Sequence, residues 1–191
     1  MSLVFSEALR QDSMVIQHEA FGKSTTVDGK MYDDTVTLGD LVIHKQSIGM
    51  VTEVKSTSMP FSNELEGVLG LGLVPLTLAA GDVSDNQLVP TVMDNLVARK
   101  LISEKILGVY FVPSNERTKQ GALTFGGFDG SVIPTDKQMH YVSATNIFTA
   151  GSYLGIEQSI TYGPNHETIL PPSTIGIIDT GATLVMLPTG G

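Results

Sequence analysis

Asp179 is the residue of this 191-residue sequence whose surroundings best suit acid–base chemistry. It lies between the apolar pair Ile177-Ile178 and Gly181, and a second apolar run follows at residues 184–187. An apolar strand that ends in a glycine turn can aim a carboxylate, because the strand is buried and glycine permits a tight turn. One carboxylate can act as a general base or as a general acid, but it cannot supply both functions in one step. The alternative is an ordinary turn in which the aspartate accepts hydrogen bonds from its own backbone.

The other polar residues form no recognisable catalytic or metal-binding pattern. Asp33 and Asp34 are neighbours on a predicted strand, so we expect them to point to opposite faces as solvated residues of a hairpin. The sequence contains no cysteine and no Gly-x-Ser-x-Gly, which excludes thiolate chemistry and leaves Ser-His-Asp catalysis without a supporting motif. The histidines share no ligand spacing, and we therefore predict surface positions and no metal site. They are His18, His44, His140 and His166.

The composition indicates a folded chain that avoids anionic partners. Apolar residues make up 41% of the sequence, enough to bury a core, and the formal net charge is -9. That charge repels a phosphate backbone or an anionic membrane, so we predict neither nucleic acid nor membrane as a partner. No stretch approaches the roughly 20 apolar residues that span a bilayer. Residues 1–20 lack the basic start and apolar block of a secretory signal, and we predict no signal peptide in this chain.

Short β-strands joined by tight turns are the predicted elements. The 20 glycines and 9 prolines are scattered between runs of Val, Ile, Leu, Thr and Tyr, which favours an all-β class. Hairpins are predicted at residues 31–54, with Gly39-Asp40 at the turn, and at residues 108–127. The glycine-punctuated run 66–72 is predicted to be a buried strand that another backbone approaches closely. Further strands are predicted at 139–144, 153–162 and 175–187, separated by Gly-Pro-Asn and Pro-Pro turns.

One helix is predicted after Pro90. Thr91 can cap its first turn, and four apolar residues then recur at spacings that place them on one face. We expect the helix to end near Arg99-Lys100, where cations suit the helix C-terminus. The residues of the apolar face are Val92, Met93, Leu96 and Val97.

Four motifs, in order along the chain, resemble the pepsin-like aspartic proteases. These are the glycine-rich run 66–72, the helix segment 90–96, the Leu-Thr-Phe-Gly-Gly hairpin within 121–129 and Asp179-Thr180-Gly181. Residues 34–49 are similar to the fungal, polyporopepsin-like branch of that family. The resemblance covers roughly residues 30–188 and implies an incomplete bilobal fold, with the later part of an N-terminal lobe followed by the start of a C-terminal lobe.

The resemblance also implies how the chain is divided. It predicts an atypical segment at 1–29 in place of the active-site flap, N-terminal-lobe and inter-lobe strands at 30–132, and the start of the C-terminal lobe at 133–191. Phe21-Gly22 stands near the family's Tyr-Gly at the flap, although Phe21 has no hydroxyl group. Tyr153 is expected to pack within the strand that enters the second lobe.

By resemblance, Asp179 is a catalytic residue and its neighbours support the catalytic loop. The family has one Asp-Thr-Gly in each lobe. Two carboxylates about 3 Å apart cannot both ionise, so one acts as a base while the other stays protonated, and together they activate a water molecule. Thr180 would hydrogen-bond to the loop of the other lobe, and Gly181 would allow the two turns to approach. Ala182 stands where a hydroxyl residue is usual. The first Asp-Thr-Gly is expected upstream of Met1.

The implied function is aspartic endopeptidase hydrolysis of a peptide or protein substrate, with no cofactor. We predict that this chain alone is inactive, because it carries one of the two aspartates. The family resemblance implies a secreted or vacuolar location. Two alternatives remain, a non-catalytic binding protein on the pepsin scaffold and a truncated product without a function of its own.

Overall fold

The computed structural model describes residues 12–20, 23–56, 67, 69–77, 88–113, 115, 120–147, 153–182 and 184–188. The chain divides into two compact units, Met1–Lys137 and Gln138–Gly191. Strands dominate the described residues of both units, which confirms the predicted β-rich class. No helix in this described part of the chain combines the length and apolar character that crossing a bilayer requires.

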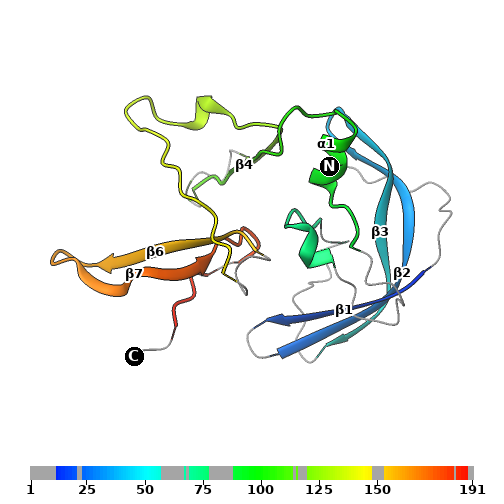
Figure 1. Ribbon diagram of the computed structural model, residues 1–191, viewed down its shortest axis with the longest axis horizontal. Helices are drawn as coiled ribbons and strands as arrows, with labels where there is room; N and C mark the ends of the chain where they lie inside the picture. The colour runs from blue at the N-terminus through cyan, green and yellow to red at the C-terminus, as the bar shows by residue number, and fades with distance from the viewer. Residues whose placement is uncertain are drawn as a thin grey trace. The chain divides into compact units, whose positions relative to one another are not determined.

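Unit 1 is built on a three-stranded antiparallel sheet in the order β1-β2-β3 (Figure 1). The strands are β1 (Asp12–Ala20), β2 (Lys23–Leu38) and β3 (Leu41–Ser56). The predicted hairpin at 31–54 is confirmed, because Leu38 pairs with Leu41 across the Gly39-Asp40 turn. Gly39 has φ +59°, a left-handed conformation that suits glycine in a two-residue hairpin turn.

A β-bulge in β3 changes which side chains face the core. Asp34 pairs with Gln46 and Val36 with Ile43, so that β3 has one extra residue in this stretch. Lys45 absorbs that residue in a left-handed conformation, with φ 51°. Ile43 and Gln46 are therefore both buried although they lie three positions apart, which simple alternation along a strand would not allow.

The predicted helix is confirmed as α1 (Val92–Ala98). Thr91 and Asp94 form a capping box, in which the Thr91 hydroxyl accepts from the Asp94 N–H and the Asp94 carboxylate accepts from the Thr91 N–H. Val92, Met93 and Leu96 are buried against the sheet, and together with apolar residues of the β2–β3 hairpin they form the core of unit 1. The core residues are Val36, Leu38, Ile43, Val92, Met93, Leu96 and Ile102.

A buried amide joins α1 to β3. The Gln46 side-chain oxygen accepts from Asn95 Nδ2 at 2.8 Å, and Gln46 Nε2 donates to the Pro90 carbonyl at 3.3 Å and the Ser47 carbonyl at 3.2 Å. These bonds satisfy a polar group that is only 5% exposed, which offsets the cost of removing it from water. Two of these bonds tie Asn95 in α1 and Pro90, the residue before the N-cap, to the bulged strand.

The second predicted hairpin of unit 1 is also confirmed, with shorter strands. It consists of β4 (Leu107–Tyr110) and β5 (Ala122–Phe125), which pair antiparallel. Two short 3₁₀ helices complete the described elements of this unit, η1 (Val74–Thr77) and η2 (Gly130–Val132).

The prediction of a buried strand at residues 66–72 is wrong for the described part of this run. Gly67 and residues 69–72 belong to no strand, and Gly67 and Gly70 are exposed. A Cβ added at either glycine would meet no atom within 4 Å. A strand needs a neighbouring backbone that accepts and donates hydrogen bonds, and none of the described residues provides one here. Leu69 still packs against the core of unit 1.

Unit 2 consists of one antiparallel hairpin in the described residues, β6 (Gly155–Tyr162) with β7 (Glu167–Ile177) (Figure 1). The predicted strand at 153–162 and the Gly-Pro-Asn turn are confirmed, since the chain turns at 163–166. The predicted Pro-Pro turn is instead a bulge inside β7. Gln158 pairs with Thr174 and Ile160 with Leu170, so three residues of β7, Pro171 to Ser173, bulge opposite one residue of β6.

Two other strand predictions in unit 2 need correction. Residues 139–144 form no strand, and only Ala144 makes an isolated bridge, to Ile156. The strand predicted at 175–187 ends at Ile177, and the described residues after it are irregular. Both segments are apolar enough for a strand but lack a paired neighbour among the described residues.

Candidate active site

Strand β7 leads directly into the Asp179-Thr180-Gly181 turn. Its last residues pair with the start of β6, with Gly155 opposite Ile177. One residue further, the Ile178 N–H donates to the Leu154 carbonyl at 2.8 Å. This bond extends the hairpin past its last ladder pair, so that the backbone is held up to the residue before Asp179.

The Asp179 side chain caps its own turn. The Gly181 N–H donates to Asp179 Oδ1 at 2.9 Å, and the Ala182 N–H donates to the Asp179 carbonyl at 3.3 Å. Asp129 makes the same kind of contact, because the Ser131 N–H donates to Asp129 Oδ1 at 2.8 Å. The turn geometry is therefore that of an ordinary aspartate turn, and by itself it does not assign catalysis to Asp179.

Gly181 leaves room for the Asp179 carboxylate. A Cβ added at this position would lie 3.3 Å from Asp179 Oδ1, closer than an ordinary van der Waals contact. The carboxylate would have to shift by a few tenths of an ångström to make room for a side chain at residue 181. Asp179, Thr180, Gly181 and Ala182 are all exposed. The role of Thr180 and Gly181 in supporting a catalytic loop stays a prediction.

The isoleucines before Asp179 are not buried, contrary to the expectation from the sequence. Ile177 is 48% exposed and Ile178 is 51% exposed. A two-stranded hairpin has no second layer to cover its apolar face, so these side chains meet solvent on unit 2. The aim of the carboxylate thus depends on backbone pairing with β6 and Leu154 and not on a packed core.

The predicted flap residues, Phe21 and Gly22, lie outside the described residues. The strands on either side of them pair, with Ala20 opposite Lys23. The predicted surface positions are confirmed for three histidines in the described part of the chain, since His44, His140 and His166 are exposed, whereas the side chain of His18 is outside it. Tyr153 is 42% exposed.

The expectation that Asp33 and Asp34 are both solvated is wrong for Asp34. Asp34 is only 5% exposed, and its Oδ1 accepts from the Thr35 N–H at 2.6 Å. Asp33 is half-buried and accepts from the Ser47 hydroxyl at 2.7 Å. The two side chains do lie on opposite faces of β2, and the face that carries Asp34 also carries the core residue Val36.

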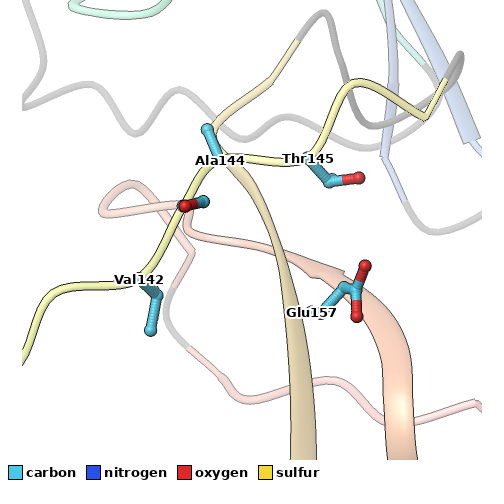
Figure 2. A pocket seen from close by; sticks show the side chains of 5 residues that line it. Val142, Ala144, Thr145 and Glu157 are labelled. Atoms are coloured by element: carbon cyan, nitrogen blue, oxygen red, sulfur yellow. The ribbon is translucent and has the colours of Figure 1, made fainter.

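A depression of about 300 Å³ lies beside the start of β6, and Asp179 is not among its lining residues. Figure 2 shows Val142, Ala144, Thr145 and Glu157 around it. Ser143 is the remaining lining residue. The lining residues come from the irregular segment 142–145 and from β6, which are joined by the Thr145 N–H bond to the Gly155 carbonyl at 2.9 Å. This depression does not contain the predicted catalytic residue.

Two contacts that hold the strand before Asp179 were missed by reasoning from the sequence. Leu154 contributes a backbone carbonyl that accepts from the Ile178 N–H. Every residue type has such a carbonyl, so the sequence carries no signal for this contact. Gln158 lies over Gly176, where an added Cβ would fall 2.0 Å from Gln158 Nε2. Glycine inside a strand generally indicates that another group approaches the backbone closely. This signal could have identified residue 176, but it could not have identified Gln158 as the neighbour.

Comparison with known proteins identifies what this arrangement is similar to. The family described as "Eukaryotic aspartyl protease" matches residues 6–190. Polyporopepsin of Irpex lacteus is 39% identical over 165 residues, which is 86% of this chain and 46% of that protein. Rhizopuspepsin-1 of Rhizopus niveus is 32% identical over 171 residues, covering 88% of this chain and 39% of that protein.

The fold comparison agrees with the sequence comparison. The crystal structure of the aspartic proteinase from Irpex lacteus matches with a TM-score of 0.76 and 36% identity, over 93% of this chain and 48% of that chain. This chain therefore spans less than half the length of each of these three relatives. The motifs noted in the sequence and the strand-rich structure lead to the same group of proteins.

Proposed function

This chain belongs to the eukaryotic aspartyl protease family, and on that premise we propose that Asp179 is one of the two carboxylates of an aspartic endopeptidase site. The observation that carries the proposal is the Asp179-Thr180-Gly181 turn at the end of a paired strand, within the region that matches the family. Asp129 has the same turn bond, but the strand before it, β5, ends four residues earlier at Phe125, and η2 begins at the next residue.

The proposed chemistry is the attack of a water molecule on a peptide carbonyl. One carboxylate removes a proton from the water while the other, kept protonated by its neighbour's charge, donates a proton. Asp179 supplies one of these groups, and the second comes from outside the 191 residues, whose sequence contains a single Asp-Thr-Gly. The substrate is a peptide or protein, no cofactor takes part, and the site of action is a secreted or vacuolar compartment.

We further propose that a polypeptide of these 191 residues is inactive alone. One carboxylate cannot be base and acid in the same step, and a single exposed aspartate has no special reactivity. The purified chain should therefore leave an unfolded protein substrate intact at acidic pH. Cleavage by the chain alone that is blocked by pepstatin and lost in Asp179→Asn would contradict this part of the proposal.

The role of Asp179 can be tested in a complete enzyme. We would replace the matched region of the Irpex lacteus aspartic proteinase with this chain and measure peptide cleavage. Asp179→Asn should lower kcat/KM by roughly 10³-fold or more, the scale of losing a member of a catalytic pair.

Asp129→Asn is the matched control for that experiment. Both substitutions keep an oxygen that can accept the turn bond and remove one exposed charge, so a purely structural role would affect them alike. A loss of similar size in both variants, or no loss in Asp179→Asn, would show that Asp179 is a turn residue. The chain would then fit a binding protein on the pepsin scaffold better than an enzyme.

A further inference from the structure

A side chain of β6 occupies the space that a side chain at Gly176 would take, three residues before Asp179. A Cβ at Gly176 would lie 2.0 Å from Gln158 Nε2 and 2.8 Å from Gln158 Cδ, so the amide group lies directly against the glycine backbone. Gln158 pairs with Thr174, which makes Gly176 its diagonal neighbour on the same face of the hairpin. Gln158 is half-buried in this position.

The part of β7 that contains Gly176 is short. The bulge at 171–173 interrupts the pairing on one side, and the bond from the Ile178 N–H to the Leu154 carbonyl is the last before Asp179 on the other. Four ladder pairs remain between them. Glycine inside a strand weakens it, because glycine has more backbone freedom than any other residue. The direction in which the chain enters the Asp179 turn therefore depends on what restrains Gly176.

The strand that carries Gln158 is firmly held. β7 pairs with the start of β6 along one edge, and on the other edge the Thr145 N–H donates to the Gly155 carbonyl at 2.9 Å. The residue before Thr145, Ala144, makes a bridge to Ile156. Backbone bonded on both edges opens less readily than backbone bonded on one. Gln158 is therefore placed to restrain the glycine of β7.

We propose that Gln158 is a positioning residue for Asp179. Its amide group takes the place of the missing side chain at Gly176 and narrows the backbone conformations open to that glycine. It thereby fixes the direction in which the following turn presents the carboxylate, which catalysis requires to within about 0.5 Å. Cross-strand side chains that cover a glycine support sheets in this way. The inference rests on the proposed function, in which Asp179 is one of the reacting pair.

Gln158→Ala removes the cover. Its effect is measured in the chimeric enzyme that carries this chain in place of the matched region of the Irpex lacteus aspartic proteinase. We expect kcat to fall roughly 10- to 100-fold, the scale of a misplacement of about 1 Å, while KM changes less than about threefold. Gln138→Ala makes the same substitution at an exposed position of unit 2 and should change neither constant more than about twofold. An unchanged kcat in Gln158→Ala would overturn the inference.

The pH profile separates positioning from a general loss of structure. Two neighbouring carboxylates titrate with apparent pKa values that their interaction pushes apart. In Gln158→Ala, movement of Asp179 away from the second carboxylate should bring the two values together and narrow the bell-shaped profile of kcat/KM by at least about half a pH unit. Unfolding of a fraction of the molecules lowers the rate by one factor without narrowing the profile, and that result would count against positioning.

A second substitution should restore the position. Gly176 is not in the left-handed region, so alanine can adopt its backbone conformation. In Gln158→Ala the methyl group of an alanine at residue 176 would fill the vacated space and restrict the backbone itself. The double variant Gln158→Ala/Gly176→Ala should therefore recover kcat to within about threefold of the unchanged chimera. A double variant as slow as Gln158→Ala would contradict the proposed role of the cover.

A measurement without catalysis keeps this inference separate from the proposed function. In the full 191-residue chain, the Ile178 amide should exchange at least about fivefold faster in Gln158→Ala than in Gln138→Ala, because its bond to Leu154 opens more often. Equal exchange in the two variants overturns the inference whatever the activity. If Asp179→Asn keeps full activity in the chimera, the proposed function fails, whereas faster Ile178 exchange still supports Gln158 as the residue that holds the strand.

Discussion

Asp179 and Asp129 show that one local geometry can serve different purposes. Each side chain accepts a hydrogen bond from the N–H two residues later, and each lies on the surface. Asp129 precedes the short helix η2, and its hydrogen bonds to Ser131 lower the pKa of this carboxyl group. The difference lies in what comes before, because a paired strand holds Asp179 whereas Asp129 follows a glycine-rich turn. A functional assignment at this scale therefore needs the strand and the family as well as the residue.

Asp94 carries a pH dependence of stability in unit 1. Burial opposes its ionisation, but hydrogen bonds from Lys105 and Thr91 outweigh that effect and lower the pKa of Asp94. Its stabilising contribution is therefore complete above the unfolded pKa, about 3.9, and is lost as the pH falls through the lower folded pKa. We expect Asp94→Asn to reduce the free energy of unfolding at pH 7 by roughly 0.5–1 kcal/mol.

Urea unfolding of both proteins between pH 7 and pH 3 measures this effect. The difference between the unchanged chain and Asp94→Asn should begin to shrink below about pH 4, where Asp94 is protonated in the unfolded state, and should disappear only when the pH falls below the lower folded pKa of Asp94. Asp136→Asn is the control, because the Asp136–Lys137 pair is exposed on both sides and should contribute nothing measurable. A constant difference at all pH values would mean that the carboxylate acts through shape and not through charge.

The backbone turn after α1, which includes Lys100, explains why the helix ends at Ala98. The Leu101 N–H donates to the Leu96 carbonyl and the Lys100 N–H to the Val97 carbonyl, both at 2.9 Å, which is the Schellman pattern. That pattern places Lys100 at φ 59°, a left-handed conformation that costs a residue with a Cβ roughly 1 kcal/mol. The sequence predicted this end from the cations, whereas the structure shows that the backbone turn ends the helix.

Lys100→Gly should therefore stabilise unit 1. We expect a gain of about 0.5–1 kcal/mol, after allowing for the greater freedom of glycine in the unfolded chain. Arg99→Gly should lower stability, because Arg99 has φ -90° and gains nothing from glycine. Thermal unfolding of the two variants beside the unchanged chain distinguishes them, and a loss of stability in both would show that the turn at residue 100 is not strained.

The two units differ in how much core they contain. Unit 1 packs α1 on a hairpin around seven buried apolar residues, and unit 2 is a hairpin with Leu170 buried among its described residues. Stability within a protein follows buried apolar contact, so the two units should open with different free energies. We expect backbone amides of β6 and β7 in the isolated chain to exchange at least about 100-fold faster than those of α1 and residues 36–43. Native-state exchange followed by mass spectrometry measures this, and equal protection in both units would contradict it.

The sequence by itself determined the features that depend on neighbouring residues. The Gly39-Asp40 turn, the Thr91 cap and the Gly-Pro-Asn turn were predicted because each follows from the backbone preferences of a few adjacent residues. The motifs that resemble the pepsin-like family were also readable, and the comparisons confirm that membership. Asp179 could be singled out as a candidate, since its triplet and flanking residues are local.

Only the tertiary structure decided the features that need a distant partner. Gly67 and residues 69–72 form no strand and Ile177 is half exposed, because a strand and a core both require a second segment alongside. The bulge at Lys45 turns Gln46 toward the core, and Pro171-Pro172 bulges within β7 instead of ending it. Side-chain direction depends on pairing register, and register is set between strands and not within one.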